Sequence, residues 1–192
     1  MTLIEAVLYI SIALALIVGG LVFFQQASLA QRTNSAVRNI SAIASETRGL
    51  YQGQNSFANF NEGALINAGA VPSSLVDNSV TPAVLRNEWG GVITAGPNLA
   101  LAAPSALAAN AGFFVIYPGL PRAACIRLSS TDDSGSGRVG SGIRSIAFKA
   151  PATASFSTEV LPASGGLSPS NVALVANCGL GDVVDVRFTF TR

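Results

Sequence analysis

Apolar side chains follow two different patterns along the first quarter of the chain. Positions 6–24 hold nineteen consecutive residues without a charge, whereas apolar and small residues beyond them recur at alternating intervals of four and three, at Leu29, Thr33, Ala36, Ile40, Ile43, Thr47 and Leu50. The first pattern is typical of a helix with apolar surroundings on every side, and the second of a helix with one buried face. Because no proline interrupts residues 1–52, we predict one continuous helix about 78 Å long at about 1.5 Å per residue.

Downstream of residue 52 the pattern changes to short apolar runs separated by Gly and Pro, which indicates strands. In the clearest run, residues 184–190, Val and Phe alternate with polar side chains as in a half-buried strand. Further strands are predicted after the turn at 89–91, through residue 94, and at 113–117, 143–149 and 156–161. Helices are predicted at 61–66, at 121–130, and from an N-cap pair at Ser168 and Pro169 to residue 176.

These elements predict an α+β fold, with four or five antiparallel strands packed on the amphipathic half of the first helix. Residues 1–24 would form a hydrophobic helix for a membrane or a filament core, residues 25–52 the amphipathic helix, and residues 53–192 a globular head. Residues 53–88 are predicted to link the helix to the first strand through short helical turns, one of them opening at Pro82. A connection of this length usually has a function or packs against neighbouring molecules. Trp89, the sole tryptophan, is expected to pack into the core.

Glu5 is the one charge ahead of the apolar run. A carboxylate in an apolar helix is costly, by about 2.5 to 3.5 kcal/mol at the centre of a membrane and less near its surface. One interpretation is an acidic residue at the helix start that rests among lipid headgroups. The other is that Glu5 neutralises the terminal amine of another copy, and so sets the axial register between packed helices.

The positive charges expected around a signal peptide or signal anchor are missing, because the first basic residue is Arg32. The pattern therefore favours an N-terminus produced by an earlier cleavage, with any basic leader already removed. Within the apolar run, Gly19 and Gly20 each weaken the helix by about 1 kcal/mol relative to Ala. They either allow close helix packing or mark a point where the helix melts when it leaves lipid.

Charge and composition exclude several kinds of function. Charged residues make up 11% of the chain, the net charge is +1 and the basic residues are scattered, so nucleic-acid binding has no electrostatic basis. The chain has no histidine, which excludes Ser-His and Cys-His nucleophiles and leaves no ligand set for zinc. The carboxylate pairs Asp132–Asp133 and Asp182/Asp185 are best explained by a solvated turn and a strand edge. No metal, cofactor or catalytic residue is therefore predicted.

A formal GxGxxG match at residues 135–140 does not change this conclusion. The dinucleotide fingerprint requires a preceding strand and a following helix. Here a Gly- and Ser-rich loop surrounds the motif, and a strand-like stretch, residues 143–149, follows it.

The first 24 residues, MTLIEAVLYISIALALIVGGLVFF, resemble the mature N-terminus of a type IV pilin. The first residue, which is not Phe, and the chain length resemble the type IVb subgroup. Residues 87–91 (NEWGG) and the cysteine pair in the C-terminal half resemble the family more loosely. The resemblance implies a leader removed by a prepilin peptidase, N-methylation of Met1, and pairing of Glu5 with the N-terminal amine of a neighbour.

Cys125 and Cys178 are the only cysteines, and two cysteines in an exported protein most often pair. We therefore expect a disulfide between them. The residues that it brackets, 126–177, resemble the disulfide-bound region of the pilin family, which is exposed on the filament.

These observations predict a structural protein, the major subunit of a type IVb-like pilus, and not an enzyme. Its partners would be copies of itself in a helical polymer, the inner membrane of a Gram-negative bacterium before assembly, and the pilus assembly machinery. The alternative is a minor pilin or a pseudopilin of a type II secretion system. A third hypothesis is an enzyme or binding protein anchored by a single membrane pass.

Overall fold

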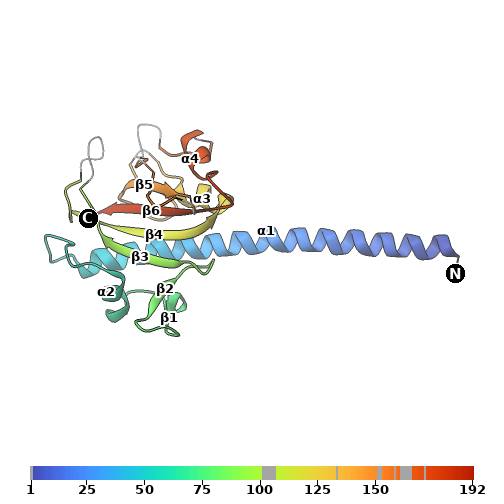
Figure 1. Ribbon diagram of the computed structural model, residues 1–192, viewed down its shortest axis with the longest axis horizontal. Coiled ribbons are helices and arrows are strands. Elements are labelled where there is room, and N and C mark those ends of the chain that lie inside the picture. The colour runs from blue at the N-terminus through green and yellow to red at the C-terminus, as the bar shows by residue number, and fades with distance from the viewer. Residues whose placement is uncertain are drawn as a thin grey trace.

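The molecule is built on α1, Leu3–Leu50, one helix that protrudes from the head over its N-terminal half and crosses the head over its C-terminal half (Figure 1). The computed structural model describes residues 2–100, 107–132, 134–150, 153–157, 159–160, 166–170 and 172–192. The predicted continuous helix is confirmed, with ends within two residues of those expected. Residues 3–27 are exposed along the whole protruding part of α1.

The C-terminal half of α1 buries the predicted stripe. Its fully buried residues are Thr33, Ala36, Ile40, Ile43, Ala44 and Thr47, and Leu29 is partly buried against the same core. Leu50 differs from the prediction, because it lies at the helix end and is 42% exposed. The last turn is instead fixed by Arg48, whose guanidinium donates to the carbonyls of Thr191 and Ser141 at 3.1 and 2.7 Å.

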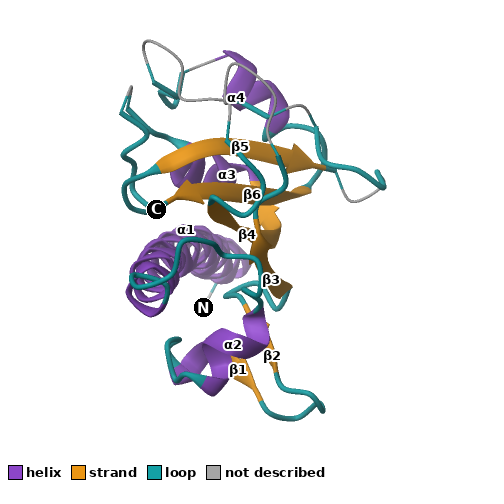
Figure 2. Cartoon of the chain, turned by 90° about the vertical axis from the view of Figure 1, so that its left-hand side faces the viewer, coloured by secondary structure: helices purple, strands orange, loops and turns teal. Residues whose placement is uncertain are grey.

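The head contains a six-stranded antiparallel sheet in the order β1-β2-β3-β4-β6-β5. The strands are β1 (Val76–Asp77), β2 (Val84–Arg86), β3 (Val92–Pro97), β4 (Gly112–Pro121), β5 (Ile143–Lys149) and β6 (Val183–Thr191). Viewed along α1, the sheet passes around one side of the helix, with β5 and β6 on one flank and β1 and β2 on the other (Figure 2). The predicted α+β architecture is confirmed. Its strands at 113–117, 143–149 and 184–190 lie within β4, β5 and β6.

The prediction for residues 53–88 was wrong in one respect, because two strands lie within that segment. β1 and β2 pair as a small hairpin, with Val76 opposite Leu85, and β2 continues the sheet beside β3. Residue 82, expected to open a helical turn, lies in the hairpin loop. The other local predictions hold: α2 (Glu62–Asn67) begins at its N-cap Asn61, whose side chain accepts from the Ala64 amide at 2.8 Å, and a 3-10 turn spans Ser73–Leu75.

Two predictions in the C-terminal half also need correction. The helix expected from residue 169 is α4 (Val172–Asn177), and residues 169 and 170 form a turn ahead of it. The strand expected at 156–161 is reduced, over its described residues, to one bridge between Val160 and Ile146 of β5, beside a bond from the Ser157 amide to the Phe148 carbonyl. By contrast, α3 (Arg122–Ser129) forms where expected, directly after its N-cap Pro121.

The core lies between α1 and the sheet, and β4 and β6 contribute its centre. Alternate residues of β6 face inward, so that Val184, Val186, Phe188 and Phe190 are all fully buried. At the end of α1 an aromatic cluster closes the core, with ring centroids 5.1 to 5.7 Å apart among Tyr51, Phe57, Phe60, Phe113 and Phe190.

Candidate assembly surface

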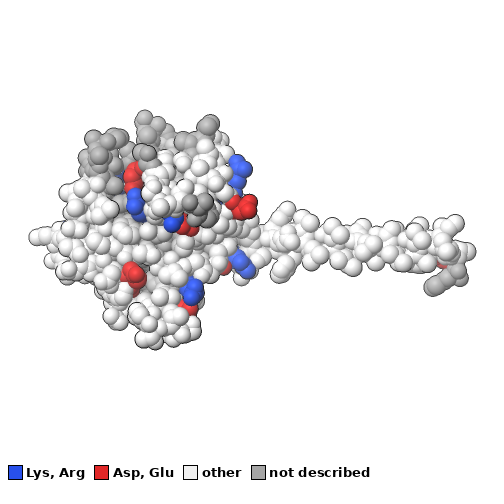
Figure 3. Space-filling model, in the orientation of Figure 1, with Lys and Arg blue, Asp and Glu red and all other residues white. Residues whose placement is uncertain are grey.

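The protruding half of α1 exposes apolar side chains along its whole length. Fifteen of its large apolar side chains, between Leu3 and Phe24, are each 49 to 83% exposed. Its only charged atoms lie near the N-terminal tip, and the head itself carries few charges on the face shown in Figure 3. A monomer rarely exposes an apolar surface of this extent to water, so this part of α1 needs lipid or protein around it.

Glu5 lies in the first turn of α1, with its carboxylate close to the helix start. One carboxylate oxygen accepts from the Thr2 amide at 3.4 Å, a long hydrogen bond from one of the backbone N–H groups that a helix start leaves free. Met1 lies outside the described residues. Within the described chain, Glu5 therefore binds one N–H group of its own helix start and remains exposed for a further partner.

Gly19 and Gly20 lie in the middle of the exposed half of α1 and stay fully helical. A methyl group added at either position would meet nothing within 4 Å. Neither glycine is therefore required for packing inside a single copy of the chain, and both interpretations of the pair depend on neighbouring molecules.

The turn between β2 and β3, residues 87–91, is held by the side chain of Asn87. Its oxygen accepts from the amides of Trp89 and Gly91 at 3.0 and 2.8 Å, and its nitrogen donates to the Pro118 carbonyl at 2.6 Å. Gly91 is required at this point, because a Cβ would lie 2.7 Å from the Pro118 ring. The NEWGG segment thus locks the β2–β3 turn against the end of β4.

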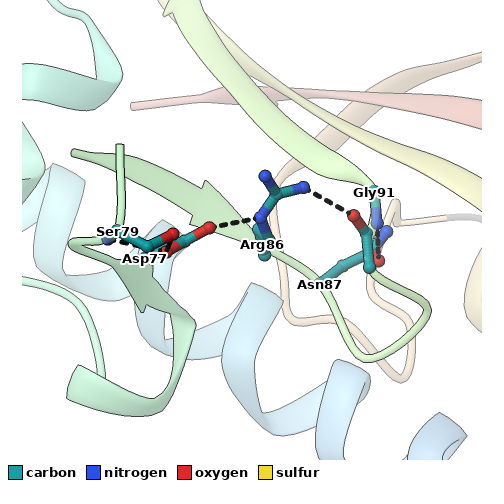
Figure 4. A network of polar contacts seen from close by, with 6 residues as sticks. Asp77, Ser79, Arg86, Asn87 and Gly91 are labelled. Carbon is teal, nitrogen blue, oxygen red and sulfur yellow. Dashed lines mark hydrogen bonds and ion pairs between the residues drawn. The ribbon is translucent and has the colours of Figure 1, made fainter. Parts of the chain in front are cut away.

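Arg86 extends this network to the β1–β2 hairpin (Figure 4). Its guanidinium is 2.5 Å from the Asp77 carboxylate and donates to the Gly90 carbonyl at 3.0 Å. The hydrogen bond from Arg86, together with those from Ser79, lowers the pKa of Asp77 to about 2. Asp77 is therefore ionised at any physiological pH, and the hairpin is tied to the NEWGG turn.

Glu88 connects the same turn to α1 and to the sheet. Its two carboxylate oxygens accept from the Asn39 amide at 2.6 Å and from the Tyr117 hydroxyl at 3.1 Å. Burial, and next the charge of Glu88, raise the pKa of Tyr117 well above its usual value. Sequence reasoning did not find this cluster, because its three members lie in separate elements and have no shared local pattern.

Trp89 is half-buried, with part of the indole packed against the core. The expectation of a core residue was therefore only partly right. The remainder of the ring faces a groove beside α1.

The predicted disulfide between Cys125 and Cys178 is present, and both residues are fully buried. It joins α3 to the residue after α4, across 53 positions of sequence. The disulfide therefore ties the C-terminal end of the segment between the two cysteines, residues 126–177, to α3.

The residues considered for chemistry have structural roles. Asp132 closes its own loop by accepting from the amides of Ser134 and Ser136, both at 2.9 Å, and Asp133 lies outside the described residues. Asp185 forms an ion pair with Lys149 at 3.2 Å and accepts from the Gly119 amide. The GxGxxG segment leads into strand β5 and not into a helix. Across the described ranges, no three His, Cys, Asp or Glu side chains come together as metal ligands.

A long helix with a bare apolar half, crossing a disulfide-bonded head with an antiparallel sheet, is the architecture of a type IVb-like pilin. Solved structures share this fold. The chain is similar to a type IVb pilin from Salmonella typhi, with a TM-score of 0.55 and 23% identity over 81% of this chain and 97% of that one. It is also similar to TcpA, a type IV pilin from Vibrio cholerae El Tor, with a TM-score of 0.51 and 18% identity over 84% and 99% of the two chains.

The sequence comparisons give the family. The family model described as PilS N terminal matches residues 30–191, and the chain belongs to that family. It is also 26% identical, over 133 residues, to the major structural subunit of the bundle-forming pilus of Escherichia coli O127:H6 and to that of strain O111:H-. The match spans 68% of this chain and 63% of each of these relatives.

Proposed function

We propose that this chain is a structural subunit of an extracellular type IV pilus, with copies of itself as its principal partners, and not an enzyme. The observation that carries the proposal is the contrast between the two halves of the continuous helix α1. One face of its C-terminal half is buried by the head, whereas its N-terminal half has no partner in the described chain. Bundling the exposed halves of many copies removes them from water and leaves the heads on the outside.

Before assembly, the subunit is stored in the inner membrane by a single pass of α1. The most apolar stretch of this helix has a mean hydropathy of 2.6 and is long enough to cross a bilayer. A prepilin peptidase would remove a leader, and Met1 would then be N-methylated. Transfer from lipid to a filament core exchanges one apolar environment for another, so helix packing and polar pairing must supply the preference, and an assembly machinery the work.

Glu5 supplies the polar pairing by neutralising the terminal amine of a neighbouring copy. Glu5 is exposed, and within the described chain it accepts one long bond, from the Thr2 amide, which leaves most of its acceptor capacity for a neighbour. A pair of opposite charges in an apolar bundle favours one axial register, because any other register leaves both charges unpaired.

The test compares Glu5→Gln with Glu46→Gln, an exposed glutamate on the same helix. Gln keeps the acceptor that holds the Thr2 amide but removes the charge. We expect Glu5→Gln to insert into membranes and fold its head normally while yielding few fibres in material sheared from cells. Glu46→Gln should assemble as the wild type does.

Normal fibres from Glu5→Gln would overturn the pairing and leave the pilus-subunit proposal intact. A wild-type chain that is scarce in sheared fibres would instead favour the alternative of a minor pilin or a type II secretion pseudopilin. A wild-type chain that stays monomeric under all assembly conditions would overturn the proposed function itself.

A further inference from the structure

A groove of about 300 Å³ lies where α1 leaves the head. One wall is formed by Phe24, Ser28 and Arg32 of α1, and the other by Trp89 of the NEWGG turn and Pro121 at the end of β4. The groove therefore joins the last residue of the apolar run to the head, and none of its described lining residues is acidic.

Two polar groups at this groove have no partner within the described chain. Arg32 is exposed and forms neither an ion pair nor a hydrogen bond there, although Arg48, Arg86 and Arg187 are all engaged. The indole N–H of Trp89 likewise has no acceptor in that part of the chain, since the hydrogen bond from Trp89 to the Asn87 side chain is donated by its backbone amide. An unpaired guanidinium beside a half-exposed indole, with apolar walls between them, suits a surface that is apolar on one side and anionic on the other.

The position of the groove along α1 matches the edge of a bilayer. Residues 3–24 span about 33 Å as a helix, close to the thickness of a hydrocarbon core of about 30 Å. Arg32 lies eight residues beyond Phe24, or about 12 Å further along the axis. Side chains on a helix point back toward its N-terminus, so the Arg32 guanidinium reaches down toward the level at which lipid phosphates lie.

We propose that this groove is a lipid-contact site that holds the head against the membrane before assembly. The upper part of an acyl chain packs against Phe24 and Trp89, and the lipid phosphate binds the Arg32 guanidinium. Tryptophan is enriched at this level of membrane proteins for the same reason, because its ring is apolar and its N–H seeks a polar partner. The inference rests on the membrane-stored precursor proposed above, and adds that the head, and not only the helix, contacts lipid.

The single tryptophan of the chain makes the contact directly measurable. The full-length protein is reconstituted into phosphatidylcholine vesicles with and without phosphatidylglycerol. Trp89 emission is then recorded with lipids brominated near the headgroup, with lipids brominated near the chain end, and with acrylamide in the aqueous phase. We expect the shallow bromolipid to quench Trp89 emission and the deep one to quench it little. Acrylamide should quench Trp89 less in vesicles than in small detergent micelles that hold α1 alone.

Arg32→Gln tests the phosphate contact, with Arg138→Gln as the matched control. Arg138 is also exposed and unpaired within the described chain, and it lies in the loop whose Gly140 approaches Ser41 of α1. Ser41 is nine residues, or roughly 14 Å, further from the membrane than Arg32. In vesicles with phosphatidylglycerol, we expect Arg32→Gln to lower the ratio of heads in contact with lipid to heads free in water about fivefold. This is the effect of losing one arginine near an anionic membrane surface. Arg138→Gln should leave that ratio unchanged.

Vesicle flotation separates the outcomes. Protein that floats with vesicles but whose Trp89 is quenched by acrylamide and by neither bromolipid overturns the lipid contact and leaves membrane storage standing. An equal effect of Arg32→Gln and Arg138→Gln overturns the role of Arg32. Protein that does not float overturns membrane storage and this inference together.

Discussion

Asn39 of α1 and Glu88 of the NEWGG turn are 49 positions apart, yet the Asn39 amide donates a 2.6 Å hydrogen bond to the Glu88 carboxylate. The second carboxylate oxygen accepts from Tyr117 in the middle of β4. Glu88 has no cationic partner in the described part of the chain, so its charge is stabilised by these two neutral donors. One side chain thereby fixes the helix, the turn and the sheet relative to one another.

Replacing Asn39 by Ala should lower the free energy of unfolding by about 2 kcal/mol, since a half-buried carboxylate loses a strong donor. Asn34→Ala is the matched control, because Asn34 is exposed on the same helix and its side chain forms no hydrogen bond within the described chain. Urea unfolding of the full chain in detergent, followed by the near-ultraviolet signal of the head, measures both. Equal stability of the two variants would contradict this role of Asn39.

The Tyr117 hydroxyl makes the head sensitive to alkali. Burial, and then Glu88, raise the pKa of Tyr117 in the folded state, whereas a free tyrosine has a pKa of about 10. The unfolded chain therefore releases this proton first, so the contribution of Tyr117 to stability is complete below about pH 10 and declines as the pH rises further. We expect the unfolding midpoint of the wild type to fall more steeply above pH 10 than that of Tyr117→Phe. Parallel curves for the two proteins would count against the buried, protonated hydroxyl.

The disulfide closes a loop across 53 positions, which corresponds to about 4 kcal/mol of stability in the chain-entropy description. Reduction of the wild type should lower its free energy of unfolding by that amount. The reduced wild type keeps the volume of both sulfur atoms, whereas the double variant Cys125→Ala, Cys178→Ala also leaves a small cavity. The double variant should therefore be the less stable of the two. A reduced protein as stable as the oxidised one would show that the bond adds nothing to the fold.

The double variant Gly19→Ala, Gly20→Ala tests the two interpretations of the glycine pair. It should stiffen α1 by about 2 kcal/mol without disturbing the head, because a Cβ at either position meets nothing within the chain. If the pair is a melting point, fibres should assemble normally but extend less under force in an optical trap. A loss of assembly with correct membrane insertion would instead identify close helix packing as the role of these residues.

The elements that sequence analysis predicted well are those with a repeated pattern. The stripe from Thr33 to Thr47 and the alternation in β6 each repeat over several residues, so the buried face of each element can be recognised from its sequence pattern. β1 and β2 are two and three residues long, too short for any period, and their pairing is decided by the Asp77–Arg86 contact and by the neighbouring β3. At α4 (Val172–Asn177) the local signal of Ser168 and Pro169 predicted a helix start where the structure has a turn.

The same distinction applies to the assembly surface. Glu5, the glycine pair and the apolar run are local features, so their positions could be read directly from the sequence. The contacts of Asn39, Glu88 and Tyr117, and the groove between Arg32 and Trp89, depend on how distant elements meet. Because these residues lie 29 to 57 positions apart, no local spacing in the sequence predicts that they come together.

The two edges of the sheet carry a consequence for how copies of this chain can associate. β1 is only two residues long, and the outer side of β5 is already occupied by the backbone groups of Ser157 and Val160. Over the residues that the structure describes, neither edge presents the long row of free amides and carbonyls that a strand from another molecule would need. Association of crowded heads by strand addition is therefore not expected, and the exposed half of α1 remains the surface through which copies of the chain would pack.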